Sequence, residues 1–216
     1  TGLGDQVLDL IDYCWRTITF EFLSGNGSIA SDKYIPNVAE DAKKAAEMSS
    51  EERLHAQLRE LQIRRAFMCI SILWFIVERF AALPLAGINA ILNKHDLVVG
   101  FANLIEIQPW LLRSGGRGGS SSSSSDWYKF KSQSFEKINP TDAPMVCIPE
   151  AHCWFALHYL VCDRECRAKY QYNRFRKEQV MRIKKYLNEV LVDQLPVLVD
   201  LQRLVEELSF IEPPAG

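Results

Sequence analysis

Apolar residues recur every three or four positions along most of this chain, which predicts a molecule built from helices. In the first such stretch they are Val7, Leu8, Ile11, Cys14, Trp15, Ile18 and Phe22. A second stretch begins at Ser49, which has the spacing of a capping box with Glu52, and it contains no Pro or Gly before Pro84. We therefore expect one helix over 7–22 and one long helix over 50–83.

The long predicted helix changes character halfway along. Its first half is amphipathic through Leu54, Leu58 and Leu61, whereas AFMCISILWFIV, residues 66–77, is apolar on nearly every side. These twelve residues are too few to span a bilayer. The pattern instead predicts a helix that lies in the centre of the fold.

The remainder of the chain also favours helices. We expect them near 85–93, 97–107, 149–162, 164–172, 175–192 and 197–209. Residues 127–138 begin with strand-like alternation but are too few for an independent sheet, so we expect an extended segment packed on helices. The predicted fold class is all-α, with armadillo- or HEAT-like stacked helical hairpins, although the chain has no strict internal repeat.

One segment interrupts this pattern. Residues 114–126, SGGRGGSSSSSSD, contain no apolar side chain and predict a flexible linker. Both a natural linker and an engineered replacement for a longer loop fit this composition. The linker divides a single helical domain into an amino-terminal part, 1–113, and a carboxy-terminal part, 127–216. The sequence starts without Met, and we expect a fragment or a processed chain.

The net charge and the use of cysteine restrict the class of partner and the cellular compartment that we expect. The 216 residues carry a formal net charge of -2, which does not favour binding to nucleic acid or to an anionic membrane. A chain of this length can bury a core without disulfides or metal. Cys14 and Cys69 lie in apolar helical patterns and are expected to be buried free thiols. This usage favours a reducing compartment and a cytoplasmic location.

Residues 152–166, HCWFALHYLVCDREC, are the candidate metal site. On one helix His158 and Cys162 are four residues apart and could share a metal ion, and His152 and Cys166 fall on the same broad arc. These four positions extend over roughly 21 Å of helix, too far for one zinc ion to collect them all. The chain has no C-x-x-C pair. We favour a buried, apolar helix without a metal.

A basic run over 164–185, with interleaved aromatic residues, is the candidate interaction surface. It could bind an acidic protein, or RNA through stacking, although charge runs more often solvate a helix face. Because the whole chain is acidic, a protein partner fits better than nucleic acid. The predicted partner-binding residues are Arg174, Arg176, Lys177, Arg182, Lys184 and Lys185.

Catalytic signatures are missing from the sequence. It contains no phosphate-binding G-x-x-x-x-G-K-[ST], no G-x-S-x-G, no H-E-x-x-H and no dinucleotide-binding glycine pattern. We therefore expect a protein that is not an enzyme.

Three stretches carry a family resemblance. They are VLDLIDYCWRTIT at 7–19, LNKHDLVVGFANLIEIQPW at 92–110, and the tail over 153–214 that includes LVDQLPVLVDLQRLVEEL. In this order and spacing the chain resembles the central helical region of the zinc finger MYND domain-containing protein 10 family. The resemblance covers most of the chain except 24–50 and 111–126.

The resemblance implies a cytoplasmic, non-enzymatic adaptor for the preassembly of axonemal dynein arms in motile cilia. The implied partners are Hsp90, an FK506-binding immunophilin, a leucine-rich-repeat assembly factor and dynein chains, without nucleic acid or membrane. It places the family's zinc ligands in a C-terminal MYND module, and no such Cys/His cluster occurs in this sequence. The alternative hypothesis is a regulatory helical domain that binds metal near His158 and Cys162, or RNA through 164–185.

Overall fold

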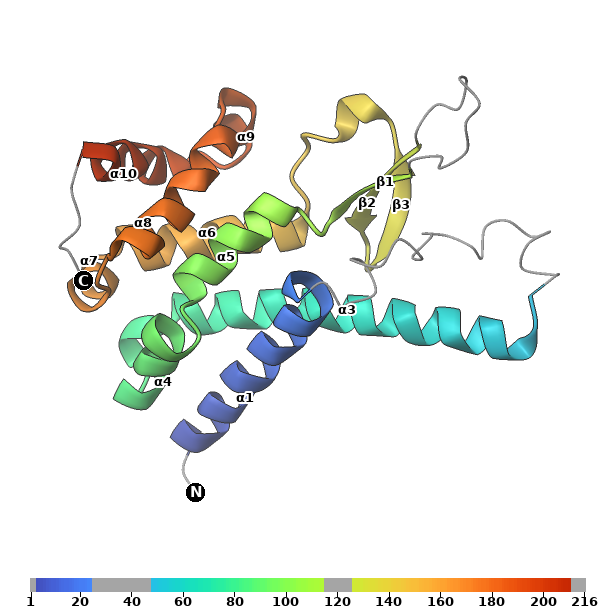
Figure 1. Cartoon of the computed structure of the whole chain (residues 1–216), viewed down its shortest axis with the longest axis horizontal. Helices are drawn as coiled ribbons and strands as arrows, with labels where there is room; N and C mark the ends of the chain where they lie inside the picture. The colour runs from blue at the N-terminus through green and yellow to red at the C-terminus, as the bar shows by residue number, and fades with distance from the viewer. Residues whose placement is uncertain (1–2, 25–47, 115–125, 211–216) are drawn as a thin grey trace.

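The computed structural model describes residues 3–24, 48–114 and 126–210. Within these ranges the chain is mostly helical, as expected, with a small three-stranded antiparallel sheet (Figure 1). The helices are α1 (Leu3–Ile18), α3 (Ser50–Glu78), α4 (Leu85–Asn89), α5 (Leu97–Ile107), α6 (Ile148–Cys162), α7 (Arg164–Lys169), α8 (Arg174–Met181), α9 (Glu189–Gln194) and α10 (Leu198–Phe210). The strands are β1 (Leu111–Ser114), β2 (Asp126–Lys131) and β3 (Ser134–Ile138). Armadillo- or HEAT-like stacking stays a prediction.

Helix α6 is the centre of the packing. It contacts α3, α5, α7 and α10, and in Figure 1 it lies among them. Trp154, Leu157 and Leu160 are all buried on it, and their spacing of three residues places them on one broad face of the helix. The opposite side, which includes Phe155 and His158, is half-buried, so the apolar helix that the sequence predicted to be buried is covered most completely on one face.

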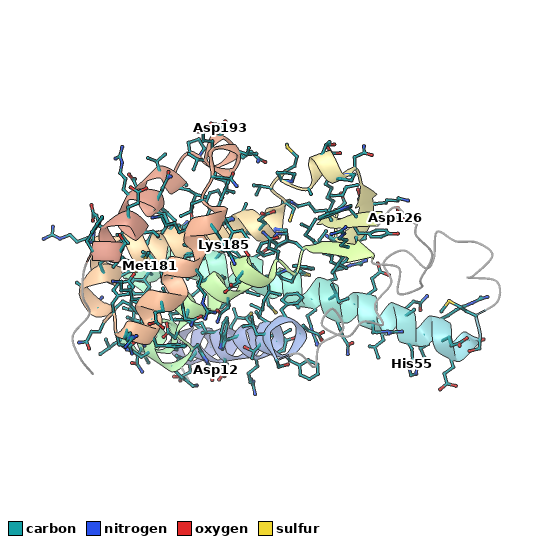
Figure 2. All side chains as sticks on the ribbon, turned by 45° about the horizontal axis from the view of Figure 1, so that its top comes forward. Asp12, His55, Asp126, Met181, Lys185 and Asp193 are labelled. Atoms are coloured by element: carbon teal, nitrogen blue, oxygen red, sulfur yellow. The ribbon has the colours of Figure 1, made fainter. Side chains whose placement is uncertain are left out.

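Helix α3 begins with the predicted capping box. The Ser49 hydroxyl accepts a hydrogen bond from the Glu52 backbone N–H at 3.2 Å, and the Glu52 carboxylate accepts one from the Ser49 N–H at 2.8 Å. The buried residues of α3 run from Ile63 to Val77. The turns before Ile63, marked by His55 in Figure 2, extend beyond the other helices.

The expected extended segment over 127–138 is in fact part of a sheet, so that prediction was incomplete. Strands β2 and β3 form a hairpin, and β1 pairs with the other edge of β2. Ser132 and Gln133 at the hairpin turn have φ values of 48° and 72°. Two consecutive left-handed residues suit a type I′ turn, which Asn-Gly or Asp-Gly usually supplies. Ser-Gln does not signal such a turn in the sequence.

The prediction of a single helix over 175–192 was also wrong. The structure has α8, then a 3-10 turn over Arg182–Tyr186, then α9. Asn188 causes the second break, because its side chain accepts a hydrogen bond from the Leu191 backbone N–H at 3.0 Å and caps α9. The 3-10 turn also lets Ile183 reach the core, where it is fully buried.

The two parts of the chain on either side of 114–126 share one core. Helix α5 from the first part packs on α6 from the second, and Ser114 pairs with Asp126 across β1 and β2. Residues 115–125, most of the expected linker, lie outside the described residues, so the linker and domain division stay predictions. No helix among the described residues is long and apolar enough to cross a bilayer. Cys14 and Cys69 are buried free thiols, as expected.

Replacing the buried indole of α6 tests this architecture. Trp154→Ala is expected to lower the free energy of unfolding by about 3–5 kcal/mol, because it removes a large side chain that is 2% exposed. Urea denaturation followed by circular dichroism measures the loss. The control is Phe175→Ala, whose side chain is exposed, with an expected change within about 0.5 kcal/mol. Equal losses in the two variants would contradict the central position of α6.

Candidate functional site

The predicted partner-binding residue Arg176 is engaged inside the molecule. Its guanidinium Nε donates to the Asp96 carboxylate at 2.7 Å, its Nη1 donates to the Gln171 carbonyl at 2.9 Å, and it stacks on the Tyr170 ring with 4.6 Å to the centroid. The Tyr170 hydroxyl also donates to Asp96, at 2.7 Å. Arg176 therefore joins the start of α8 to the start of α5.

Asp96 is the acceptor at the centre of this network. It is the N-cap of α5, with a left-handed backbone at φ 47°, and its side chain accepts from the Val99 backbone N–H. Burial is the main cause that raises the pKa of Tyr170, and the hydrogen bond to Asp96 adds to it. Tyr170 therefore stays a neutral donor at ordinary pH.

Two further members of the basic run lie against α5. Arg182 and Lys185 approach the Glu106 carboxylate at 3.4 Å and 3.1 Å, and Figure 2 shows Lys185 beside α5. Lys185, followed by Arg182, lowers the pKa of Glu106, so this carboxylate stays charged. Both basic side chains remain half-exposed and keep solvent access.

The other three residues of the predicted set face outward to different extents. Arg174 is highly exposed and pairs with Glu178 one helical turn away, at 3.0 Å. Lys177 is half-buried and its ammonium donates to the Ser209 carbonyl at 3.5 Å. Lys184 is exposed in the 3-10 turn. The run thus divides into internal and outward-facing cations, and the partner-binding role of all six residues stays a prediction.

The candidate metal stretch is divided between two helices. Helix α6 ends at Cys162, and Asp163 caps α7 by accepting from the Glu165 and Cys166 backbone N–H groups at 2.9 Å and 3.0 Å. Burial raises the pKa of Cys162 to about 11 and that of Cys166 to about 12. Without a metal, both thiols are therefore protonated at neutral pH.

The two histidines of this stretch have different surroundings. The His152 Nδ1 atom lies 2.9 Å from the Ser71 hydroxyl of α3. The His158 Nε2 atom is buried without a hydrogen-bond partner in the described part of the chain, and desolvation lowers the pKa of its ring. Over residues 3–24, 48–114 and 126–210, no three His, Cys, Asp or Glu side chains gather in a group that could hold a metal ion.

A cavity that the sequence did not predict lies between the end of α5, the hairpin and α6. It has a volume of about 250 Å³, and its walls include Trp110, Trp127, Trp154 and Tyr186. Lys129 and Glu150 form its charged part. Part of this cavity could have been predicted from the sequence, because Trp127 and Lys129 are two residues apart and therefore lie on the same face of one strand.

The lysine of this cavity is 1% exposed. Its ammonium donates to the Ala143 carbonyl at 2.8 Å and lies 3.0 Å from the Glu150 carboxylate, which also accepts from the Cys147 backbone N–H at 3.3 Å. Burial raises the pKa of Glu150 above its ordinary value, with Lys129 opposing that change. The pair joins the hairpin to the start of α6.

Removing the ammonium from this pair should destabilise the fold in a pH-dependent way. Lys129→Met is expected to cost about 3–5 kcal/mol near pH 7, because it leaves a buried carboxylate unpaired. The native-state pKa of Glu150, already raised, would rise further. Folding then favours the protonated form of Glu150. The loss in free energy of unfolding should therefore grow from pH 5 to pH 8 in denaturant titrations.

The double variant Lys129→Met/Glu150→Gln is the control for this experiment. It removes both charges and should recover most of the lost stability and remove the added pH dependence. If the double variant is as unstable as Lys129→Met at both pH values, the buried charge pair is not the cause of the loss.

Arginines on the same helix allow a matched comparison of an internal and an outward-facing cation. Arg176→Ala should lower the free energy of unfolding by about 1.5–3 kcal/mol, because Asp96 loses a charged donor. Arg174→Ala should change it by less than about 0.5 kcal/mol, since exposed pairs contribute little. Thermal unfolding of both variants measures the difference, and similar melting temperatures would exclude the bridging role of Arg176.

Comparisons with known proteins find a distant relative. No family model matches the chain, and no solved structure matches it. A Drosophila melanogaster protein named "Zinc finger MYND domain-containing protein 10 homolog" is 26% identical to it over 207 residues. The match covers 96% of this chain but 42% of that protein, so the chain spans less than half the length of this relative. The resemblance inferred from the sequence is thus confirmed as a distant homology to this zinc finger MYND domain-containing protein 10 homolog.

Proposed function

We propose that this chain is a non-enzymatic scaffold region that binds chaperones and assembly partners during the cytoplasmic preassembly of axonemal dynein arms. The observation that carries the proposal is the match to a zinc finger MYND domain-containing protein 10 homolog across 96% of the chain. A similarity of that extent concerns the whole helical body, not one short motif. Its partners in this proposal are Hsp90, an immunophilin, a leucine-rich-repeat assembly factor and dynein chains.

The architecture supports a scaffold through its rigidity. Helices from both halves of the sequence pack on α6, and polar bridges such as Arg176 to Asp96 join α8 to α5. A rigid body presents outward side chains at constant positions, which lowers the entropy lost when a partner binds. In this proposal the helices stack in an armadillo- or HEAT-like manner, with partner contacts on the exposed side of α8 and the turn that follows it.

The outward-facing cations are the residues to test for partner binding. Among the described residues Arg174 pairs with Glu178 of its own helix and Lys184 is exposed, so reversing their charge should leave the fold intact. The double variant Arg174→Glu/Lys184→Glu, in the full-length protein, should reduce copurification of Hsp90, the immunophilin or the leucine-rich-repeat factor several-fold. In ciliated cells that lack the endogenous protein, it should restore fewer dynein arms than the unchanged protein.

Arg203→Glu is the matched control, because Arg203 is an exposed cation on α10 outside the basic run. It should leave both copurification and dynein-arm assembly unchanged. Quantitative blots of the captured partners and of axonemal dynein heavy chain supply the two readouts. If a full-length protein without this region restores normal dynein arms, the proposed function is wrong; if only the charge reversal has no effect, the partner surface lies elsewhere.

A further inference from the structure

A second apolar stripe runs along α3, on the side away from the core. Its positions are four and three residues apart in alternation over three heptads, and we call it the heptad stripe: Leu54, Leu58, Leu61, Arg65, Met68, Ile72 and Phe75. Ile72 is half-buried, and the other apolar members are all exposed. Single exposed apolar residues are common on soluble proteins, but a continuous row of them indicates a contact surface.

The heptad stripe is separate from the buried face of the same helix. Ile70 is fully buried, whereas Leu61, nine residues earlier, is exposed. Nine residues correspond to about 2.5 turns, so these two side chains lie on opposite sides of α3. Helix α3 therefore has one apolar face against α1 and α6, and another that is exposed at Leu54, Leu58, Leu61 and Met68 and reaches α6 at Phe75.

The spacing of the stripe defines the shape of its partner. Apolar residues at alternating steps of three and four form the seam of a left-handed pair of helices, in which each side chain fits between four residues of the facing helix. The turns of α3 before Ile63 contribute no buried residue, and helices of that length are marginal in water by themselves. A second helix along the stripe would supply the missing packing.

The charge on the heptad stripe indicates which kind of helix can bind to it. Arg65 is the only charged member of the stripe; it is exposed, and no carboxylate of the described residues pairs with it. Gln57 and Gln62 beside the stripe carry no charge. A second copy of this chain, either parallel in register or antiparallel about Arg65, would place two Arg65 side chains against each other. A different helix with a carboxylate at that position would gain an ion pair instead.

The carboxy-terminal end of the stripe reaches α6. Phe75 packs edge-on against the His152 ring with 5.6 Å between centroids, and His152 is anchored by the Ser71 hydroxyl. Ile148, one turn before His152 on α6, is highly exposed. The apolar surface therefore continues from α3 onto the start of α6, which lengthens the contact available to a docked helix.

We propose that the heptad stripe binds an amphipathic α-helix of another protein, with apolar residues at heptad spacing and a Glu or Asp facing Arg65. This surface is distinct from the basic residues of 174–185. The inference rests on the geometry of α3 and does not depend on a role in dynein-arm assembly.

A pair of synthetic peptides tests the proposal with the purified 216-residue chain. Each peptide is a three-heptad amphipathic helix with Leu at the seam and either Glu or Lys at the central seam position. Fluorescence anisotropy is expected to show binding of the Glu peptide about tenfold tighter than of the Lys peptide. Arg65→Glu should invert that preference, because the charges on the two helices are then exchanged.

Substitutions in the stripe provide the second arm. Leu58→Asp/Met68→Asp should weaken binding of the Glu peptide at least about tenfold with an unchanged melting temperature, because both side chains are exposed. The matched control Leu85→Asp replaces an exposed leucine of α4 outside the stripe and should leave binding unchanged. Binding that survives Leu58→Asp/Met68→Asp, or that ignores the peptide charge, overturns the proposal.

Two further measurements distinguish which molecule binds the heptad stripe. Analytical ultracentrifugation should find the chain monomeric; a dimer that Leu58→Asp/Met68→Asp dissociates would mean that a second copy occupies the stripe, and would overturn the proposal. A photoreactive amino acid in place of Leu61, in the full-length protein in cells, should crosslink to a heptad-patterned segment of another protein that carries a carboxylate. Crosslinks confined to the same chain would also overturn it.

Discussion

The structure depends on the burial of one helix that is apolar around its whole circumference. Helix α6 is covered by α3, α5, α7 and α10, and Trp154, Leu157 and Leu160 lie on its buried face. Apolar burial contributes roughly 25 cal/mol per Å² and has no direction, so it brings the helices together without choosing their order. Indole side chains such as Trp154 then restrict how closely each neighbour approaches.

Polar bridges select one arrangement from those that burial alone would allow. Asp96 holds Arg176 and Tyr170 at the start of α5, and the buried pair of Lys129 and Glu150 joins the hairpin to α6. An unmade hydrogen bond in such places costs more than a made one contributes. Alternative packings that separate these partners are therefore disfavoured, and a body held in this way can present its surface without rearrangement.

The surface carries two chemically different features. Around α8 and the turn after it, cations such as Arg174 and Lys184 point outward, while others in the same run are used to hold α5. Along α3, a stripe of exposed leucines and other apolar side chains surrounds one arginine. Electrostatic surfaces mainly affect the rate and selectivity of association, whereas apolar seams supply affinity. The scaffold role that we propose would use both.

The sequence by itself determined the helical class, the capping box at Ser49 and the apolar character of α6, because these follow from local periodicity and local hydrogen bonds. It did not determine the hairpin, because Ser132 and Gln133 adopt left-handed conformations that only their tertiary setting stabilises. Nor did the sequence show that Arg176 and Arg174, two residues apart, have different roles. Their roles differ because Asp96, 80 positions earlier, lies beside one and not the other, and such pairing exists only after folding.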